Sequence, residues 1–144
     1  MSEKVLFLDF DGVLHPTYSG SPKFTQAPLL ESVLTKRPCK VIISSSWRFH
    51  MNNEKLLSHF SPSLQKIIIG TTGKAQISRH ARFEEINAFV NKYQITDWRA
   101  LDDAYWEFPV NCMNLIRCNP NTGITQSELN YLIEWLESPV IGCC

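Results

Sequence analysis

The sequence lacks the features that define several classes of protein. No apolar run approaches the roughly 20 residues that a membrane-spanning helix needs, and no internal repeat or low-complexity segment is visible. The 14 basic and 14 acidic residues give a formal net charge of zero, which gives no support for non-specific binding to nucleic acids or membrane surfaces. With 44% hydrophobic residues, the composition instead predicts one compact domain over residues 1–144.

Cysteine and histidine are too few and too scattered to predict a disulfide framework or a zinc site. The five cysteines are odd in number, and none belongs to a Cys-x-x-Cys pair. We expect Cys39, Cys112 and Cys118 to be reduced thiols in or near the core. The terminal Cys143–Cys144 pair is expected to be a simple tail, with lipidation as the alternative.

The four histidines show no metal-ligand spacing, and each is expected on the surface or in a loop: His15, His50, His59 and His80. The chain enters an apolar segment almost at once, which leaves no room for a signal peptide and predicts a cytoplasmic location.

The segment from Val5 to Pro16, VLFLDFDGVLHP, is the most informative stretch. Its apolar run ahead of Gly12 predicts a buried strand that ends in a tight turn. Side chains alternate along a strand, so Asp9 and Asp11 are expected to point the same way while Phe10 enters the core. Two carboxylates at a buried strand end repel each other and lose hydration, so we expect a cation between them.

Hydrophobic periodicity predicts an alternation of strands and helices along the rest of the chain. Further strands are expected at 40–44, 65–70, 98–103 and 114–118. Helices are expected at 27–36, 52–60, 79–93 and 125–136, the last of these opened by the capping-box spacing of Thr125 and Glu128.

This order predicts an α/β fold: a three-layer, Rossmann-like sandwich with a central five-stranded, mainly parallel sheet. Ligands of such sheets bind beyond the carboxyl ends of the strands. The polar clusters of this sequence occur at those ends, namely Asp9 with Asp11, Ser44 to Ser46, and Asp102 with Asp103. If the acidic strands are neighbours, they form an oxygen-ligand pocket suited to Mg²⁺.

Such a pocket suits phosphoryl chemistry. Asp9 is a candidate nucleophile that would form an aspartyl-phosphate, and Asp11 is placed to protonate the leaving oxygen and then to accept a proton from water. Ser44 and Ser45, with backbone N–H groups, are candidates to hold phosphoryl oxygens, and a Lys or Arg would offset the negative charge.

The motifs also carry a family resemblance. Asp9-Phe10-Asp11-Gly12-Val13 resembles the first motif of the haloacid dehalogenase (HAD)-like hydrolase superfamily, Ser44 its second, and Leu101-Asp102-Asp103 its fourth. The segments SSSWR and HARFEEI, with LDD and LIRC, resemble more narrowly a group of small HAD-domain proteins of the RNA-repair-associated type.

The resemblance implies a HAD-like sandwich and Mg²⁺-dependent phosphatase chemistry through an aspartyl-phosphate. It implies that Asp9 is nucleophile and metal ligand, that Asp11 is acid/base and binds the metal through its backbone carbonyl, and that Asp102, together with Asp103, completes the metal site. For the third motif, one basic residue, Arg82 is the first choice for binding phosphate. The alternatives are Arg79, Lys74 and Arg48.

Neither gap between the motifs is long enough for the cap domain that many superfamily members carry, so an open site is expected. An open site suits a bulky phosphorylated substrate, such as a nucleotide or a nucleic-acid end. Trp47 and Trp106 are expected in the core. The alternative is that these two residues, together with Tyr18 and Arg48, flank the motifs and contact the substrate. The rival to an enzyme is a non-catalytic module that binds phosphate groups or a partner protein.

Overall fold

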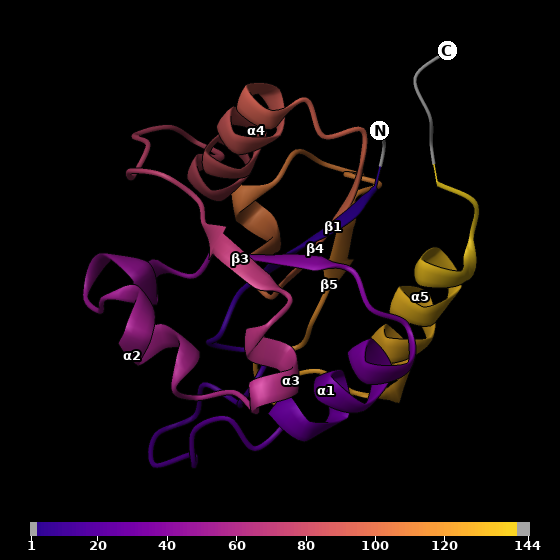
Figure 1. The fold of residues 1–144 in the computed structure, drawn as a ribbon. Helices are drawn as coiled ribbons and strands as arrows, with labels where there is room; N and C mark the ends of the chain where they lie inside the picture. The colour runs from indigo at the N-terminus through magenta and orange to yellow at the C-terminus, as the bar shows by residue number, and fades with distance from the viewer. Residues whose placement is uncertain (1–2, 141–144) are drawn as a thin grey trace.

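The computed structural model describes residues 3–140, which form a parallel β-sheet between two layers of helices (Figure 1). The sheet has the strand order β3-β2-β1-β4-β5, and every pair of neighbours is parallel. The strands are β1 (Lys4–Leu8), β2 (Lys40–Ile43), β3 (Ile68–Thr71), β4 (Asp97–Asp102) and β5 (Leu115–Arg117). The predicted α/β class and five-stranded parallel sheet are therefore confirmed.

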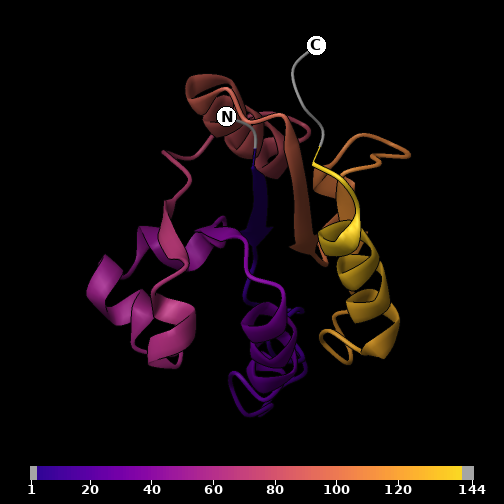
Figure 2. The same cartoon turned by 45° about the vertical axis from the view of Figure 1, so that its right-hand side comes forward.

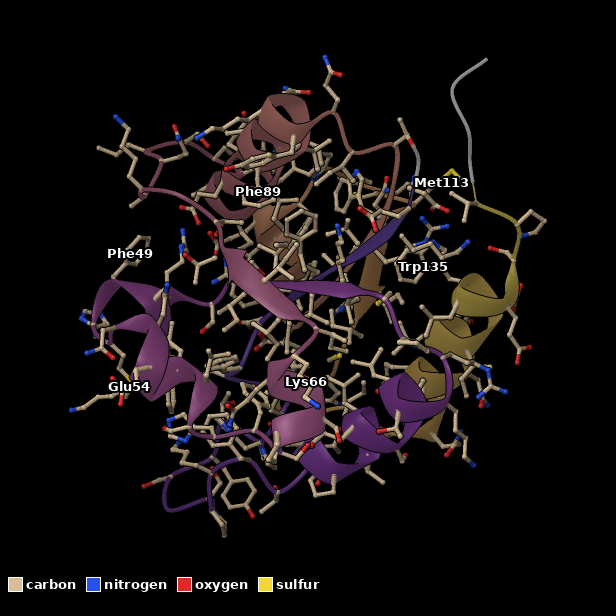
Figure 3. The ribbon with its side chains drawn as sticks, in the orientation of Figure 1. Phe49, Glu54, Lys66, Phe89, Met113 and Trp135 are labelled. Carbon is tan, nitrogen blue, oxygen red and sulfur yellow. The ribbon has the colours of Figure 1, made fainter. Side chains whose placement is uncertain are left out.

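The helices cover the two faces of the sheet unequally (Figures 1 and 2). They are α1 (Ala27–Lys36), α2 (Asn53–Leu57), α3 (Pro62–Gln65), α4 (Ala81–Tyr93) and α5 (Gln126–Glu137). Buried residues of α1, α2, α3 and α5 form one core with one face of the sheet, whereas α4 supplies the helical part of the core on the other face. Phe89 of α4 and Trp135 of α5 lie between their helices and the sheet (Figure 3).

Alternation along the strands explains the two cores. Leu6 and Leu8 of β1 belong to the core under α1 and α5, while Val5 and Phe7 belong to the core under α4. All four side chains are buried, as expected for the central strand of a parallel sheet. Phe10 is also fully buried, which confirms its predicted place in the core.

The element boundaries agree with the predicted ones to within a few residues, with one larger difference. The predicted helix at 52–60 is shorter, because α2 ends at Leu57, and a separate turn of helix, α3, follows. Pro62 begins α3, and Ser61 caps it by accepting the Leu64 N–H through its hydroxyl. The predicted strand at 65–70 therefore begins later, at Ile68.

Side-chain caps begin two of the helices. Asn52 caps α2 by accepting the Lys55 N–H, and Thr125 and Glu128 form the predicted capping box at the start of α5. Cys118 is buried, and Cys39 and Cys112 are partly buried, as expected. Cys143 and Cys144 lie outside the described residues, so the prediction for that pair is untested.

Within the described residues, neither a membrane-spanning helix nor an inserted cap domain is present. No helix within 3–140 is long and apolar enough to cross a membrane. The connections between the motifs hold short helices, turns and β3 rather than an inserted cap domain, as the short gaps predicted.

Candidate active site

Three strand ends place polar side chains on the face of the sheet that α4 covers. Phe7 of β1 and Ala100 of β4 face the core under α4, and so does Ile42 of β2. Because side chains alternate, the residues two positions further along share this face. These residues are Asp9, Asp102 and Ser44.

The same residues are level with one another across the sheet. The backbone ladder continues past the strand ends, since the Asp9 N–H donates to the Leu101 oxygen at 3.1 Å and the Ser44 N–H donates to the Leu8 oxygen at 2.9 Å. The Thr72 N–H extends it to the next strand, donating to the Ile43 oxygen at 3.0 Å. Thr72, Ser44, Asp9 and Asp102 therefore form one row across four neighbouring strands, which we call the polar row.

Asp103 joins the acidic end of the polar row. Asp9, Asp102 and Asp103 each offer a carboxylate oxygen, and these atoms lie within 4.8 Å of one another. Asp102 is fully buried and Asp9 is 4% exposed. Gly12 makes room for this cluster, because a Cβ at that position would overlap the Asp103 carboxylate, and its φ of +78° is one that glycine adopts readily.

Arg82, from the first turn of α4, supplies a buried positive charge to the cluster. Its Nη1 atom donates to Asp102 Oδ2 at 2.5 Å and lies 3.3 Å from Asp9 Oδ1. The other Asp102 oxygen accepts the Ala104 N–H at 3.0 Å. Arg82 is the predicted first choice among the basic residues, and the structure brings it to the carboxylates of both acidic strands.

The ionisation of the cluster reflects its burial. Loss of hydration raises the pKa of Asp9 well above the ordinary value, the Asp102 charge raises it further, and Arg82 opposes the rise. Burial and Asp102 also raise the pKa of Asp103. Burial disfavours the charged form of Arg82, but Asp102 and Asp9 outweigh this and raise its pKa. Three carboxyl groups thus surround one guanidinium, and in their ionised form Arg82 alone does not neutralise them, which favours binding of a cation.

Two buried hydroxyl groups occupy the other end of the polar row. Ser44 is fully buried and Thr72 is 3% exposed, and neither Ser44 Oγ nor Thr72 Oγ1 has a hydrogen-bond partner within residues 3–140. An unpaired buried hydroxyl is costly, so such groups often mark a place where a ligand or water completes the bonding. Ser45 differs, because its hydroxyl accepts the Trp47 N–H and caps a short 3₁₀ helix at Ser46–Phe49.

The remaining basic candidates lie in other environments. Arg48 forms a buried ion pair with Glu85 at 2.7 Å and donates to the backbone oxygens of Ser44, Ser45 and Gly73. It therefore ties together the loops that follow β2 and β3. Lys74 and Arg79 are exposed.

Asp11 is not part of the acidic cluster that the other three carboxylates form. The strand β1 ends at Leu8, before both carboxylates, and a turn at residues 12–14 follows Asp11. Its carboxylate pairs with His15 Nε2 at 2.7 Å and accepts from Trp47 Nε1 at 3.0 Å. The cation expected between Asp9 and Asp11 is instead Arg82, between Asp9 and Asp102.

Several residues near the site differ from expectation. His15 is fully buried rather than on the surface, and Trp106 is 59% exposed rather than in the core. Trp47 is partly buried against the core, as expected. Thr72 was not among the predicted site residues, although the polar run GTTG after the third strand resembles the other polar strand ends and could have indicated it.

The comparison with known protein families agrees with this geometry. No curated protein matches the chain. A family model described as the HAD domain in Swiss Army Knife RNA repair proteins matches residues 5–129, which include β1 with Asp9 and Asp11, Ser44, Arg82 and the Asp102–Asp103 pair. The chain thus belongs to the family of HAD domains found in Swiss Army Knife RNA repair proteins.

Proposed function

We propose that the protein is a Mg²⁺-dependent phosphatase that hydrolyses phosphomonoesters through a phosphorylated Asp9. The observation that carries the proposal is the polar row, in which the buried Asp9 carboxylate lies between a second carboxylate, Asp102, and an unpaired buried hydroxyl, Ser44. Phosphoryl transfer requires a nucleophile that has cation ligands on one side and, on the other, a group that donates a hydrogen bond to the phosphoryl oxygens. Membership of a HAD family supports this chemistry.

The acidic cluster fits Mg²⁺ by the chemistry of its donors. Asp9, Asp102 and Asp103 offer only hard oxygen atoms, gathered within 4.8 Å, which Mg²⁺ prefers. We propose these three carboxylates as ligands, together with the backbone carbonyl of Asp11. Bound Mg²⁺ would neutralise charge on the carboxylates and on the phosphoryl oxygens.

The proposed reaction has two steps. An Asp9 oxygen attacks phosphorus, the bond from phosphorus to the ester oxygen breaks, and Asp11 gives its proton to that departing oxygen. A water molecule then attacks the phosphorus of the aspartyl-phosphate, and the Asp11 carboxylate accepts a proton from it. Inorganic phosphate leaves, and Asp9 and the protonated Asp11 are regenerated.

Phosphoryl oxygens would be held by Ser44 and Arg82, as expected from the sequence, and we add Thr72. The hydroxyls of Ser44 and Thr72 can donate to an anion without giving up a bond within the protein. The assignment of Ser45 stays a prediction. Since the described residues include no cap domain, we propose that the site accepts a bulky phosphomonoester, such as a nucleotide or a nucleic-acid end.

The test compares the wild-type protein with Asp9→Asn and with Glu134→Gln, a control on the exposed side of α5. Release of phosphate from 4-nitrophenyl phosphate and from 5′- and 3′-phosphorylated oligonucleotides is measured with and without Mg²⁺. We expect Mg²⁺-dependent turnover in the wild type and in Glu134→Gln, and a loss of at least about 10³-fold in Asp9→Asn. Equal turnover in wild type and Asp9→Asn would overturn the mechanism.

The rival function, a non-catalytic phosphate-binding module, is favoured by one observation. Arg82 contacts both Asp9 and Asp102, so the carboxylates already have a counter-charge without a metal ion. A wild-type protein that binds a phosphorylated oligonucleotide in equilibrium titration but releases no phosphate would support this module and overturn the phosphatase.

A further inference from the structure

The Asp11 carboxylate is held by two side chains to which the proposed reaction gives no role. His15 Nε2 lies 2.7 Å from Asp11 Oδ1, and Trp47 Nε1 lies 3.0 Å from Asp11 Oδ2. His15 is fully buried, whereas the Asp11 side chain is 48% exposed. Each Asp11 oxygen thus has one partner on its buried side, and the carboxylate still faces the outside of the molecule.

The direction of the His15 hydrogen bond follows from the other nitrogen of the ring. The Phe24 backbone N–H donates to His15 Nδ1 at 3.1 Å, so Nδ1 acts as an acceptor and carries no proton. A neutral imidazole then has its single N–H at Nε2, which points at Asp11. Both groups facing Asp11 are therefore N–H donors, since the Trp47 indole nitrogen can only donate.

Neither donor is free to turn away, because both rings are packed in an aromatic cluster. The His15 ring lies 5.2 Å from the Phe24 ring and 5.8 Å from the Trp47 ring, measured between centroids. Trp47 also makes edge contacts with Phe10 and Phe24, at 5.4 Å each. The turn itself is closed by a hydrogen bond from the Gly12 N–H to the His15 oxygen at 2.9 Å.

We propose that His15 and Trp47 are positioning residues that orient the Asp11 carboxylate for proton transfer to the leaving group. This inference rests on the proposed phosphatase function. Each carboxylate oxygen has two lone-pair directions, and the two donors occupy one on each oxygen, which leaves the outward directions for the ester oxygen and for water. The Asp9 carboxylate lies beside Arg82 instead, so the two carboxylates of the motif have different partners.

Substrates with different leaving groups distinguish positioning of an acid from general support of the fold. Departure of 4-nitrophenolate needs little protonation, whereas departure of the more basic phenolate needs an acid. We compare kcat/KM for 4-nitrophenyl phosphate and phenyl phosphate, because kcat/KM reports the step in which the leaving group departs. The variants are Trp47→Phe, which keeps an aromatic ring without the N–H, and His15→Phe, with His15→Gln as a rescue that restores an N–H.

In Trp47→Phe and in His15→Phe we expect kcat/KM to fall about tenfold for phenyl phosphate and less than about threefold for 4-nitrophenyl phosphate. His15→Gln should regain part of the loss for phenyl phosphate. Circular dichroism checks that each variant is folded. Equal losses for both substrates, or no loss for either, would overturn the positioning role.

A second measurement does not depend on activity. In protein labelled with ¹⁵N at the indole nitrogen, the Trp47 resonance is assigned by its disappearance in Trp47→Phe. We expect Asp11→Ala to move it upfield, through loss of the hydrogen bond, and Asp103→Ala to leave it in place. If Asp11→Ala does not shift the Trp47 indole resonance, the positioning role is overturned, but the phosphatase proposal is not affected. If the wild type has no phosphatase activity but Asp11→Ala does shift the resonance, the phosphatase proposal is overturned, and with it the catalytic role of the contact between Trp47 and Asp11.

Discussion

Arg82 reaches from the first turn of α4 to Asp102 at the end of β4, where its Nη1 atom donates to Asp102 Oδ2 at 2.5 Å. The helix thereby bridges the acidic ends of the central strand β1 and its neighbour β4, since the same nitrogen lies 3.3 Å from Asp9. Removal of one partner from a buried ion pair leaves an uncompensated charge. The stability of the metal-free protein should therefore depend on Arg82.

We predict that Arg82→Ala lowers the free energy of unfolding by about 3 kcal/mol in the absence of Mg²⁺. Arg79→Ala, at an exposed position just before α4, is the control and should change it by less than about 0.5 kcal/mol. Urea denaturation followed by circular dichroism measures both. Similar, small effects in the two variants would contradict the buried ion pair.

The raised pKa of Asp9 predicts a specific dependence of stability on pH. Burial first, and then Asp102, raise the pKa of Asp9 above its ordinary value of 3.8, so the folded protein binds more protons than the unfolded chain between 3.8 and the raised pKa. The contribution of Asp9 to stability is therefore most favourable below this window and is lost as the pH rises through it.

Asp9→Asn removes this contribution, because an amide does not titrate. We expect the metal-free variant to be more stable than the wild type at neutral pH, by on the order of 1 kcal/mol, and the difference to shrink as the pH falls toward 4. Urea denaturation at a series of pH values measures it. A difference that grows as the pH falls would contradict the direction of the shift.

The unpaired hydroxyl of Thr72 predicts a variant that weakens phosphate binding but not the fold. Thr72→Val removes a buried group that has no partner within the described residues, so the free energy of unfolding should fall by less than about 0.5 kcal/mol or rise. Competitive inhibition by inorganic phosphate should weaken about threefold to tenfold, the value of one hydrogen bond. Thr72→Ser, which keeps the hydroxyl, should bind phosphate as the wild type does. A strongly destabilised Thr72→Val, with unchanged inhibition, would contradict a ligand-facing role.

Gly12 and Gly20 offer a matched pair that separates backbone strain from crowding. Both have a positive φ, +78° and +81°, but a Cβ would overlap the Asp103 carboxylate only at Gly12 and meets nothing within 4 Å at Gly20. Alanine should destabilise the protein by about 1–2 kcal/mol at either position through strain. Only Gly12→Ala should also weaken Mg²⁺ binding, measured by isothermal titration calorimetry. Equal Mg²⁺ affinity in the two variants would contradict a role for Asp103 in the cation site.

Local patterns predicted most of the fold because periodicity and caps depend on neighbours in the chain. The apolar run before Asp9, the helical spacing from Ile86 to Val90 and the capping box at Thr125 each led to an element that the structure contains. The region from Ser58 to Gln65 was less well predicted. The sequence indicated a helix at 52–60 and a strand at 65–70, but α2 ends at Leu57 and Pro62 opens the separate helix α3.

The sequence by itself determined which residues end the strands, because apolar runs and turn formers are local signals; Asp9, Ser44 and Asp102 could all be named from them. Only the tertiary structure decided which of these meet, since the strand order brings β2, β1 and β4 side by side and the register makes their ends level. It also decided that Arg82 rather than Arg48 contacts the carboxylates, because α4 packs over that face. Likewise it placed His15 and Trp47 against the Asp11 carboxylate.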